Sequence, residues 1–314
     1  MQIETSVRGA DVYVVQPTSP PVSDNLVELL LMISALRNAS SRHVTAVIPY
    51  FGYMRFDGSE LLSQRVAKKP DGKYDDETAI ETTDTHRTSF VAMADVAKMF
   101  EIVGCSRVVT FDLHASGQSV AEGFFANTQV ENIRSGPLVA KELVQKLSLD
   151  PAKDLVVVAP HSSCFSKAKK FQSNMKKILG NDNVGLALVV RRPPSTQSGE
   201  TVVDLVGDVS GKSVLIVEDI VDSGRSVARA ARAAKEAGAT NVYAFASHAV
   251  LSGDASIRLQ KCEPLEKIVV LNTVPVSAEN REKCPKLDLI DVSPMIAKVL
   301  IDLHMKEESS QPSS

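Results

Sequence analysis

Tryptophan is absent from this chain of 314 residues, and cysteine is scarce. The four cysteines are far apart, with no CxxC pair and no Cys/His spacing typical of a metal site: Cys105, Cys164, Cys262 and Cys284. Because these cysteines are isolated and their neighbours look like strand ends and helices, we expect reduced thiols in a cytosol-like compartment. No apolar stretch approaches the ~18 residues of a membrane-spanning helix, and no signal-peptide core opens the chain. We therefore expect a soluble cytoplasmic protein.

A strong charge of one sign is also missing. The formal net charge is −3, so no global field would draw the protein to nucleic acid or to a membrane. Basic residues gather only in "KAKKFQSNMKK" (167–177), which we interpret as the solvated face of a helix. The sequence thus argues against nucleic-acid and membrane partners.

Short β-branched runs alternate with amphipathic helical patterns along the chain. The runs are almost continuously apolar, as expected of parallel strands covered on both faces. Expected strands are 11–16, 43–50, 107–113, 154–160, 184–190, 213–219, 241–248 and 267–273. Expected helices are 24–40, 90–104, 137–148, 226–238 and 293–304. This alternation predicts an α/β fold with parallel sheets flanked by helices.

The length predicts two domains of ordinary size. We place them at residues 1–146 and 147–314, with the last helix packing back on the first domain. The polar segment 58–86 is longer than an ordinary connection and is interpreted as a mobile loop or a disordered insertion. The end of the chain, "KEESSQPSS", is expected to be disordered.

The stretch "SVLIVEDIVDSGRSV" (213–227) carries Glu218, Asp219 and Asp222 at and just beyond the end of an apolar strand. Ligands of open parallel sheets bind beyond the carboxyl ends of the strands. The turn "DSGRS" and the following helix, expected to begin at Ser226, offer backbone N–H groups that suit a phosphate monoester. The two acids on the strand suit ribose hydroxyls, directly or through Mg²⁺. The alternative is a capped helix with acids near its first turn, worth under ~1 kcal/mol.

This stretch resembles the phosphoribosyl-pyrophosphate (PRPP) binding motif of type I phosphoribosyltransferases and of ribose-phosphate pyrophosphokinases. Other stretches resemble the pyrophosphokinase family in order, among them "SVRGADVYVVQ", "VTAVIPYFGY", "VVTFDLHAS" and "GATNVYAFASHAVLSGDA". The resemblance implies two phosphoribosyltransferase-like domains, a homo-oligomer (dimer or hexamer), and Mg²⁺. It also implies transfer of the diphosphoryl group of ATP to ribose 5-phosphate, making PRPP for nucleotide biosynthesis.

The resemblance also assigns site residues. It implies ATP binding in the first domain by Arg55, Asp57 and His114, and metal binding by His114 and His161. In the second domain it implies ribose 5-phosphate binding by Glu218, Asp219, Asp222, Ser223, Gly224, Arg225 and Ser226. The arginines at the start of the catalytic loop are Arg191 and Arg192.

Several positions depart from the family pattern. His161 in "APHSSC" replaces an aspartate, and histidine is a poor ligand for Mg²⁺. "LVVRRPPSTQSGE" has no lysine where the family's catalytic loop normally begins with one, and a planar guanidinium does not substitute freely for an ammonium. Arg225 replaces a usual glycine, and the resemblance begins partway into the family's first domain.

These departures keep two other functions open. The first is a catalytically impaired, regulatory or associated homologue that binds ribose phosphate and forms a hetero-oligomer with an active synthetase. The second is a salvage phosphoribosyltransferase, which would need a single domain and a hood over the base. Neither of these two features is visible in the sequence.

Overall fold

The chain is seen in a computed structural model, which describes residues 3–54, 83–113, 123–191 and 203–309. Its described residues fall into two compact units: one lies within Met1–Ile133, and the other comprises Arg134–Val190 and Val203–Ser314. Helix α5 (Gly136–Lys146) therefore belongs to the second unit, whereas the predicted boundary at 146/147 placed it in the first. No helix among the described residues is long and apolar enough to cross a membrane.

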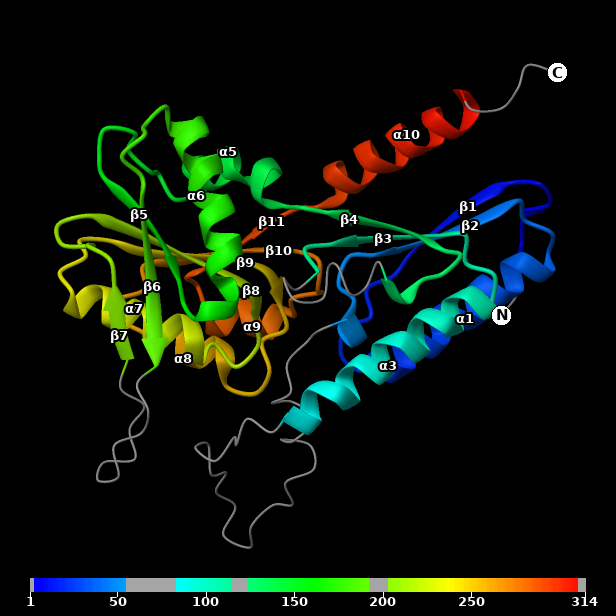
Figure 1. Ribbon diagram of the computed structural model, residues 1–314, viewed down its shortest axis with the longest axis horizontal. Helices are drawn as coiled ribbons and strands as arrows, with labels where there is room; N and C mark the ends of the chain where they lie inside the picture. The colour runs from blue at the N-terminus through cyan, green and yellow to red at the C-terminus, as the bar shows by residue number, and fades with distance from the viewer. Residues whose placement is uncertain (1–2, 55–82, 114–122, 192–202, 310–314) are drawn as a thin grey trace, which may run out of the picture. The chain divides into compact units, whose positions relative to one another are not determined.

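The first unit contains a parallel sheet in the order β1-β2-β3-β4. The strands are β1 (Asp11–Val15), β2 (His43–Ile48), β3 (Arg107–Phe111) and β4 (Gln129–Ile133). The helices are α1 (Val22–Asn38) and α3 (Thr83–Ile102), with a 3-10 turn η1 (Gly52–Met54). Both helices lie against the same face of this sheet (Figure 1). Their buried side chains pack on alternate apolar residues of the strands, and this packing forms the core of the unit.

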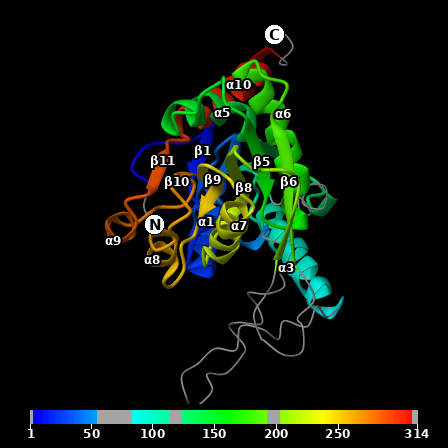
Figure 2. The same cartoon turned by 90° about the vertical axis from the view of Figure 1, so that its left-hand side faces the viewer.

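The second unit is built on a sheet in the order β11-β10-β9-β8-β5-β6-β7. Its strands are β5 (Leu155–Ala159), β6 (Gly185–Arg191), β7 (Val203–Val206), β8 (Ser213–Val221), β9 (Val242–Ala249), β10 (Lys267–Leu271) and β11 (Leu287–Ile290). Apart from α5, its helical elements are η2 (Ser162–Cys164), α6 (Phe165–Leu179), α7 (Arg225–Glu236), α8 (Ala255–Gln260), α9 (Ala278–Lys283) and α10 (Ser293–Ser309). Helices α5 and α6 lie on one face of the sheet, and α7 and α8 lie on the other (Figures 1 and 2).

All the strands and helices expected from the sequence are present, so the predicted α/β fold with parallel sheets is confirmed. The prediction that the chain is disordered from residue 306 is wrong for the first four of those residues, because α10 continues as far as Ser309. Most of segment 58–86 lies outside the described residues, but its last four residues belong to α3. The prediction missed β4, β7 and β11.

The order of the second sheet changes direction between β5 and β8. After β5 the chain continues outward through β6 to β7, and from β8 it continues the other way through β9 and β10. Strands β5 and β8 pair in parallel, with Val158 opposite Ile216. In open α/β sheets, ligands bind beyond the carboxyl ends of strands at such a switch point. We therefore expect a ligand site near the residues that follow β5 and those in the last part of β8.

Candidate functional site

Two segments distant in sequence meet at this switch point. His161 follows the end of β5 and precedes η2, while Glu218 and Asp219 lie in the second half of β8. Because Val158 is opposite Ile216, the residues just beyond each come to the same height at the edge of the sheet. Both carboxylates are buried, each residue being 3% exposed. Burying two acids beside each other is costly unless each has partners.

Glu218 has partners from three directions. The Nε2 atom of His161 lies 3.1 Å from its Oε1, and the thiol of Cys164 donates a hydrogen bond of 2.9 Å to the same oxygen. The hydroxyl of Ser226 donates to Oε2 at 3.0 Å. On its other side, the His161 ring contacts the hydroxyl of Ser163 through Nδ1 at 2.6 Å. The carboxylate of Glu218 is therefore held by the loop after β5, by η2 and by α7.

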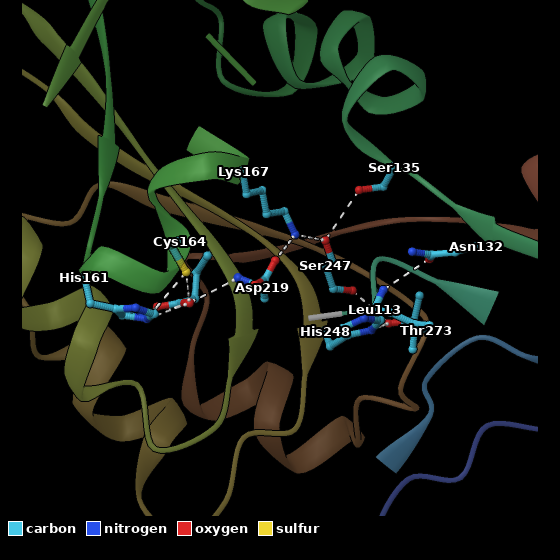
Figure 3. A network of polar contacts seen from close by, with 11 residues as sticks. Leu113, Asn132, Ser135, His161, Cys164, Lys167, Asp219, Ser247, His248 and Thr273 are labelled. Carbon is cyan, nitrogen blue, oxygen red and sulfur yellow. Dashed lines mark hydrogen bonds and ion pairs between the residues drawn. The ribbon is translucent and has the colours of Figure 1, made fainter. Parts of the chain in front are cut away.

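Asp219 is held by a different group. The Nζ atom of Lys167, from α6, lies 2.6 Å from its Oδ1. Lys167 also donates to the hydroxyl of Ser247 at 2.7 Å, and that hydroxyl lies 3.4 Å from the hydroxyl of Ser135. Figure 3 shows this chain of contacts, with the lysine extended between Asp219 and Ser247. One buried ammonium thus compensates the charge of Asp219 and joins α6 to β8 and β9.

The polar network continues along β9. The backbone carbonyl of Ser247 accepts a hydrogen bond of 2.8 Å from the hydroxyl of Thr273, which lies 2.8 Å from Nδ1 of His248. All three residues are buried, at 3% exposed or less. The network therefore fixes the positions of β8, β9 and the residues after β10 relative to one another (Figure 3).

The loop from Asp222 to Ser226 leaves β8 and enters α7. Gly224 has φ +72°, in the left-handed region, and α7 begins at the next residue, Arg225. The predicted start at Ser226 is thus one residue late. The first N–H groups of an α-helix have no partner within the helix and carry a partial positive charge, so they suit an anion. Side chains of Asp222, Ser223 and Ser226 are half-buried at this end of the helix, whereas Arg225 is exposed.

Loop backbone contacts hold this turn in place. Ser252 N–H donates to the carbonyl of Asp222 at 3.1 Å, and the guanidinium of Arg258 donates to the carbonyl of Ser223. A side chain at Gly224 would meet Leu259, since a Cβ there would lie 3.1 Å from its Cγ. The turn is therefore packed against α8, and its left-handed position favours glycine.

Burial and the charges of Glu218 and Asp219 raise the pKa of the Cys164 thiol well above its usual range. Cys164 is fully buried, so its sulfur is a neutral hydrogen-bond donor to Glu218 rather than a nucleophile. The Nε2 atom of His161 lies 3.5 Å from this sulfur and also contacts the carboxylate of Glu218. The sulfur, nitrogen and oxygen atoms of these three residues lie within 4.8 Å of one another.

Several of the predicted site residues are not described. Arg55, Asp57, His114 and Arg192 lie outside the described residues, as do most of the expected insertion and the loop after β6. Arg191 is the last residue of β6, and its side chain is not described. Among the predicted residues, the structure brings together His161, Glu218 and Ser226 through direct contacts. It places Asp219 beside them in β8 and the rest of the predicted loop at the start of α7.

Sequence reasoning missed Lys167, Ser247 and Thr273 as neighbours of the carboxylates. Lys167 belongs to the basic cluster interpreted as a solvated helix face, and for Lys169, Lys170 and Lys177 that interpretation is confirmed by their exposure. For Lys167 it is wrong, because its side chain is only 14% exposed and contacts Asp219. A helical projection would have found the signal: Lys167 is one residue before the buried Ala168 and four before the buried Phe171.

Comparison with known proteins identifies the family. Residues 1–69 match the N-terminal domain of ribose phosphate pyrophosphokinase, and residues 153–312 match the phosphoribosyl synthetase-associated domain. The chain is 34% identical over 304 residues to a ribose-phosphate pyrophosphokinase of Caldanaerobacter subterraneus subsp. tengcongensis, covering 97% of this chain and 83% of the relative. It is also 34% identical to the ribose-phosphate pyrophosphokinase of Synechococcus elongatus, covering 99% and 80%.

A solved structure agrees with these matches. The phosphoribosylpyrophosphate synthetase from Mycobacterium smegmatis superposes with a TM-score of 0.74 at 28% identity, covering 97% of this chain and 86% of that one. The similarity in sequence and in fold therefore extends over nearly the whole chain. This chain belongs to the ribose-phosphate pyrophosphokinase family.

Proposed function

We propose that this chain is a ribose-phosphate diphosphokinase that transfers the β,γ-diphosphoryl group of ATP to ribose 5-phosphate. In this reaction the oxygen on C1 of the ribose attacks the β-phosphorus and loses its proton. The bond from the β-phosphorus to the oxygen of the α-phosphate breaks, which leaves AMP and PRPP. Support comes from curated relatives of this name, which the chain matches over nearly its whole length.

One observation carries the binding half of the proposal. The carboxylates of Glu218 and Asp219, at the end of β8, and the N-terminus of α7 are joined by the loop that starts at Asp222, all at the switch point of one sheet. In the proposed complex the 5-phosphate binds to the N–H groups of α7, and the ribose hydroxyls contact the acids. Since Ser226 donates to Glu218 in the free chain, phosphate binding would redirect that hydroxyl.

The transfer half depends on residues whose side chains are not described. We propose that Arg55, Asp57 and His114 bind ATP and that Arg191 and Arg192 stabilise charge on the transferring group. Phosphoryl transfer depends mainly on positioning and charge stabilisation, which arginine can supply. When bound, Mg²⁺ would neutralise charge on the ATP phosphates. The cluster at His161 does not fit this ion, because it offers one nitrogen and one sulfur where Mg²⁺ demands oxygen.

We further propose that the protein is cytoplasmic and forms a homo-oligomer. The four cysteines are free and buried, which suits a reducing compartment. In the first unit, Val15 on β1 and Val27 and Leu31 on α1 are each more than half exposed and would be covered in an oligomer. Sedimentation velocity at several protein concentrations tests this: a monomer at micromolar concentration would contradict it.

Two measurements test the function. Purified protein incubated with ATP, ribose 5-phosphate and Mg²⁺ should form PRPP and AMP in equal amounts. Calorimetric titrations with each substrate separate the alternatives. A regulatory homologue would bind ribose 5-phosphate without useful affinity for ATP and would form no PRPP, and this result would overturn the proposal.

A variant tests where ribose 5-phosphate binds. Asp222→Asn should weaken its binding at least tenfold, because a carboxylate in the loop is lost from the sugar site. Asp182→Asn is a matched control, since Asp182 is an exposed carboxylate of the turn after α6. Equal affinities for the wild type and both variants would show that the sugar phosphate binds elsewhere.

A further inference from the structure

Three possible metal ligands with different donor atoms, a nitrogen, a sulfur and an oxygen, meet at the switch point of the second sheet. Nε2 of His161, Sγ of Cys164 and one carboxylate oxygen of Glu218 converge from the loop after β5, from η2 and from β8. Figure 3 shows the His161 ring and the Cys164 sulfur close to each other, and both contact the carboxylate of Glu218. Imidazole and thiolate are preferred by Zn²⁺ and similar divalent ions, whereas Mg²⁺ and Ca²⁺ prefer oxygen.

We propose that His161, Cys164 and Glu218 bind Zn²⁺, or a divalent ion with the same ligand preference. The site shares Glu218 with the proposed sugar site but does not depend on the proposed function, because zinc binding is measured without either substrate. Its three protein ligands would leave a fourth position for water, the arrangement typical of an open zinc site. His161 is the ligand nearest to solvent, with 31% of its side chain exposed, so an ion can reach the site from that side.

The distances among the donor atoms support this geometry. Tetrahedral zinc, with bonds of about 2.3 Å to sulfur and about 2.0–2.1 Å to nitrogen and oxygen, places its ligands roughly 3.4–3.6 Å apart. Here Sγ of Cys164 lies 3.5 Å from Nε2 of His161, which already matches. The Oε1 atom of Glu218 lies 3.1 Å from that nitrogen and 2.9 Å from the sulfur, so it would move by less than about 1 Å.

The ligands are also held by neighbours. Nδ1 of His161 contacts the Ser163 hydroxyl at 2.6 Å, which fixes the ring with Nε2 directed to the cluster. Glu218 accepts hydrogen bonds from the Ser226 hydroxyl at 3.0 Å and from the Asp219 backbone N–H at 3.1 Å. Such contacts orient metal ligands and raise affinity for the ion.

The charges balance when the metal enters. In the free protein the Cys164 thiol donates its proton to Glu218 in a hydrogen bond. Zinc takes the place of that proton, so a sulfur–metal bond forms and one H⁺ leaves to solvent. The thiolate and the Glu218 carboxylate then neutralise the two positive charges of the ion. Asp219 adds no uncompensated charge, because Lys167 already pairs with it at 2.6 Å.

The test uses the full-length protein, stripped with a chelator and kept in a non-thiol reductant. Zn²⁺ alone is titrated in competition with a chromophoric chelator. We expect one ion per chain with a dissociation constant in the micromolar range or below. Cys164→Ser and His161→Ala should each weaken binding at least 100-fold, and Ser163→Ala should weaken it about tenfold. Cys284→Ser, which removes a buried thiol outside the cluster, should leave binding unchanged.

Co²⁺ gives a second readout. The wild type should show the visible bands of a tetrahedral site and a sulfur-to-cobalt charge-transfer band, which Cys164→Ser should abolish. If that variant fails to fold by circular dichroism, His161→Ala decides, since His161 is partly exposed. The proposal is overturned if the wild type binds no zinc at micromolar concentration or if both folded variants bind like the wild type. Displacement of zinc by equimolar Mg²⁺ would overturn it as well.

Discussion

The Nζ atom of Lys167 lies 2.6 Å from Oδ1 of Asp219, and their side chains are only 14% and 5% exposed. Removing one partner of such a pair leaves an uncompensated buried charge, which costs much more than the pair itself contributes. We expect Lys167→Met, which keeps most of the aliphatic stem, to lower the free energy of unfolding by about 3 kcal/mol. Urea denaturation measures this change.

Lys170→Met is the control, because Lys170 belongs to the same helix and is exposed. It should change the free energy of unfolding by less than about 0.5 kcal/mol. Removing both charges in the double variant Lys167→Met/Asp219→Asn should restore part of the loss, giving a coupling of at least about 1 kcal/mol. Strict additivity of the two changes would show that the pair contributes nothing in the folded chain.

Gly224→Ala should destabilise the protein for two reasons. The backbone there has φ +72°, and the new Cβ would lie 3.1 Å from Cγ of Leu259. We expect a loss of roughly 2–3 kcal/mol, of which about 1–2 kcal/mol is the left-handed conformation itself. Gly180→Ala separates the two, since Gly180 has φ +62° and open space around its Cα. Equal losses of stability in the two variants would mean that the Leu259 side chain moves away from the new Cβ at no cost in free energy.

The free energy of unfolding should depend on pH through Asp11 in the first unit. Hydrogen bonds from the Arg42 guanidinium lower the pKa of Asp11, burial offsets part of this effect, and His43 lowers it further. A carboxyl with a lowered pKa stabilises the fold above its unfolded pKa of about 3.9, and this contribution is lost as the pH falls through the folded value. The partly exposed partners limit the contribution to about 1 kcal/mol at pH 7.

Comparing Asp11→Asn with the wild type in urea at pH 7 and at pH 3 measures this contribution. The difference in free energy of unfolding should be largest at pH 7 and smaller at pH 3, because acid protonates Asp11 in the unfolded chain first. Asp182→Asn, at an exposed site, is the reference for a general charge effect. A difference that grows on acidification would contradict the predicted sign.

All four thiols should be unreactive in the native, metal-free protein. Every cysteine is free and buried, and burial raises the pKa of Cys105 to about 11. At pH 8 its thiolate fraction is then about one part in a thousand, and alkylation needs the thiolate. Mass spectrometry after brief iodoacetamide treatment should find the native chain unlabelled and the guanidinium-unfolded chain labelled four times. Rapid labelling of Cys164 in the native chain would show that the site opens.

The central strands were predictable because their own residues carry the pattern of a buried strand. Residues 213–219 and 241–248 are apolar on both faces and are bounded by turns, which is typical of buried parallel strands. The missed strands lack that signal. Strand β4, "QVENI", alternates polar and apolar residues, and β11 has four residues, of which only Ile290 is buried. Pairing with a neighbouring strand, which the local sequence does not encode, makes them strands.

The candidate site also has a part that is encoded locally and a part that depends on distant segments. Glu218, Asp219 and the loop belong to one motif of consecutive residues, so their position between β8 and the start of α7 was predictable from the sequence. Their partners are non-local: His161 is 57 residues away from Glu218, and Ser247 is 80 residues away from Lys167. The sequence cannot show that Cys164 donates to Glu218, because this contact depends on how β5 aligns with β8.

That alignment sets which changes of length the site can tolerate. A one-residue slip of β5 against β8 would move His161 by about 3.3 Å along the sheet and turn the neighbouring side chains to the opposite face. Insertions in the connections between α6 and β8 leave the pairing of Val158 with Ile216 intact, whereas a deletion within either strand destroys it. The spacing between the end of β5 and His161 is therefore a stricter constraint on this protein than the identity of most surface residues.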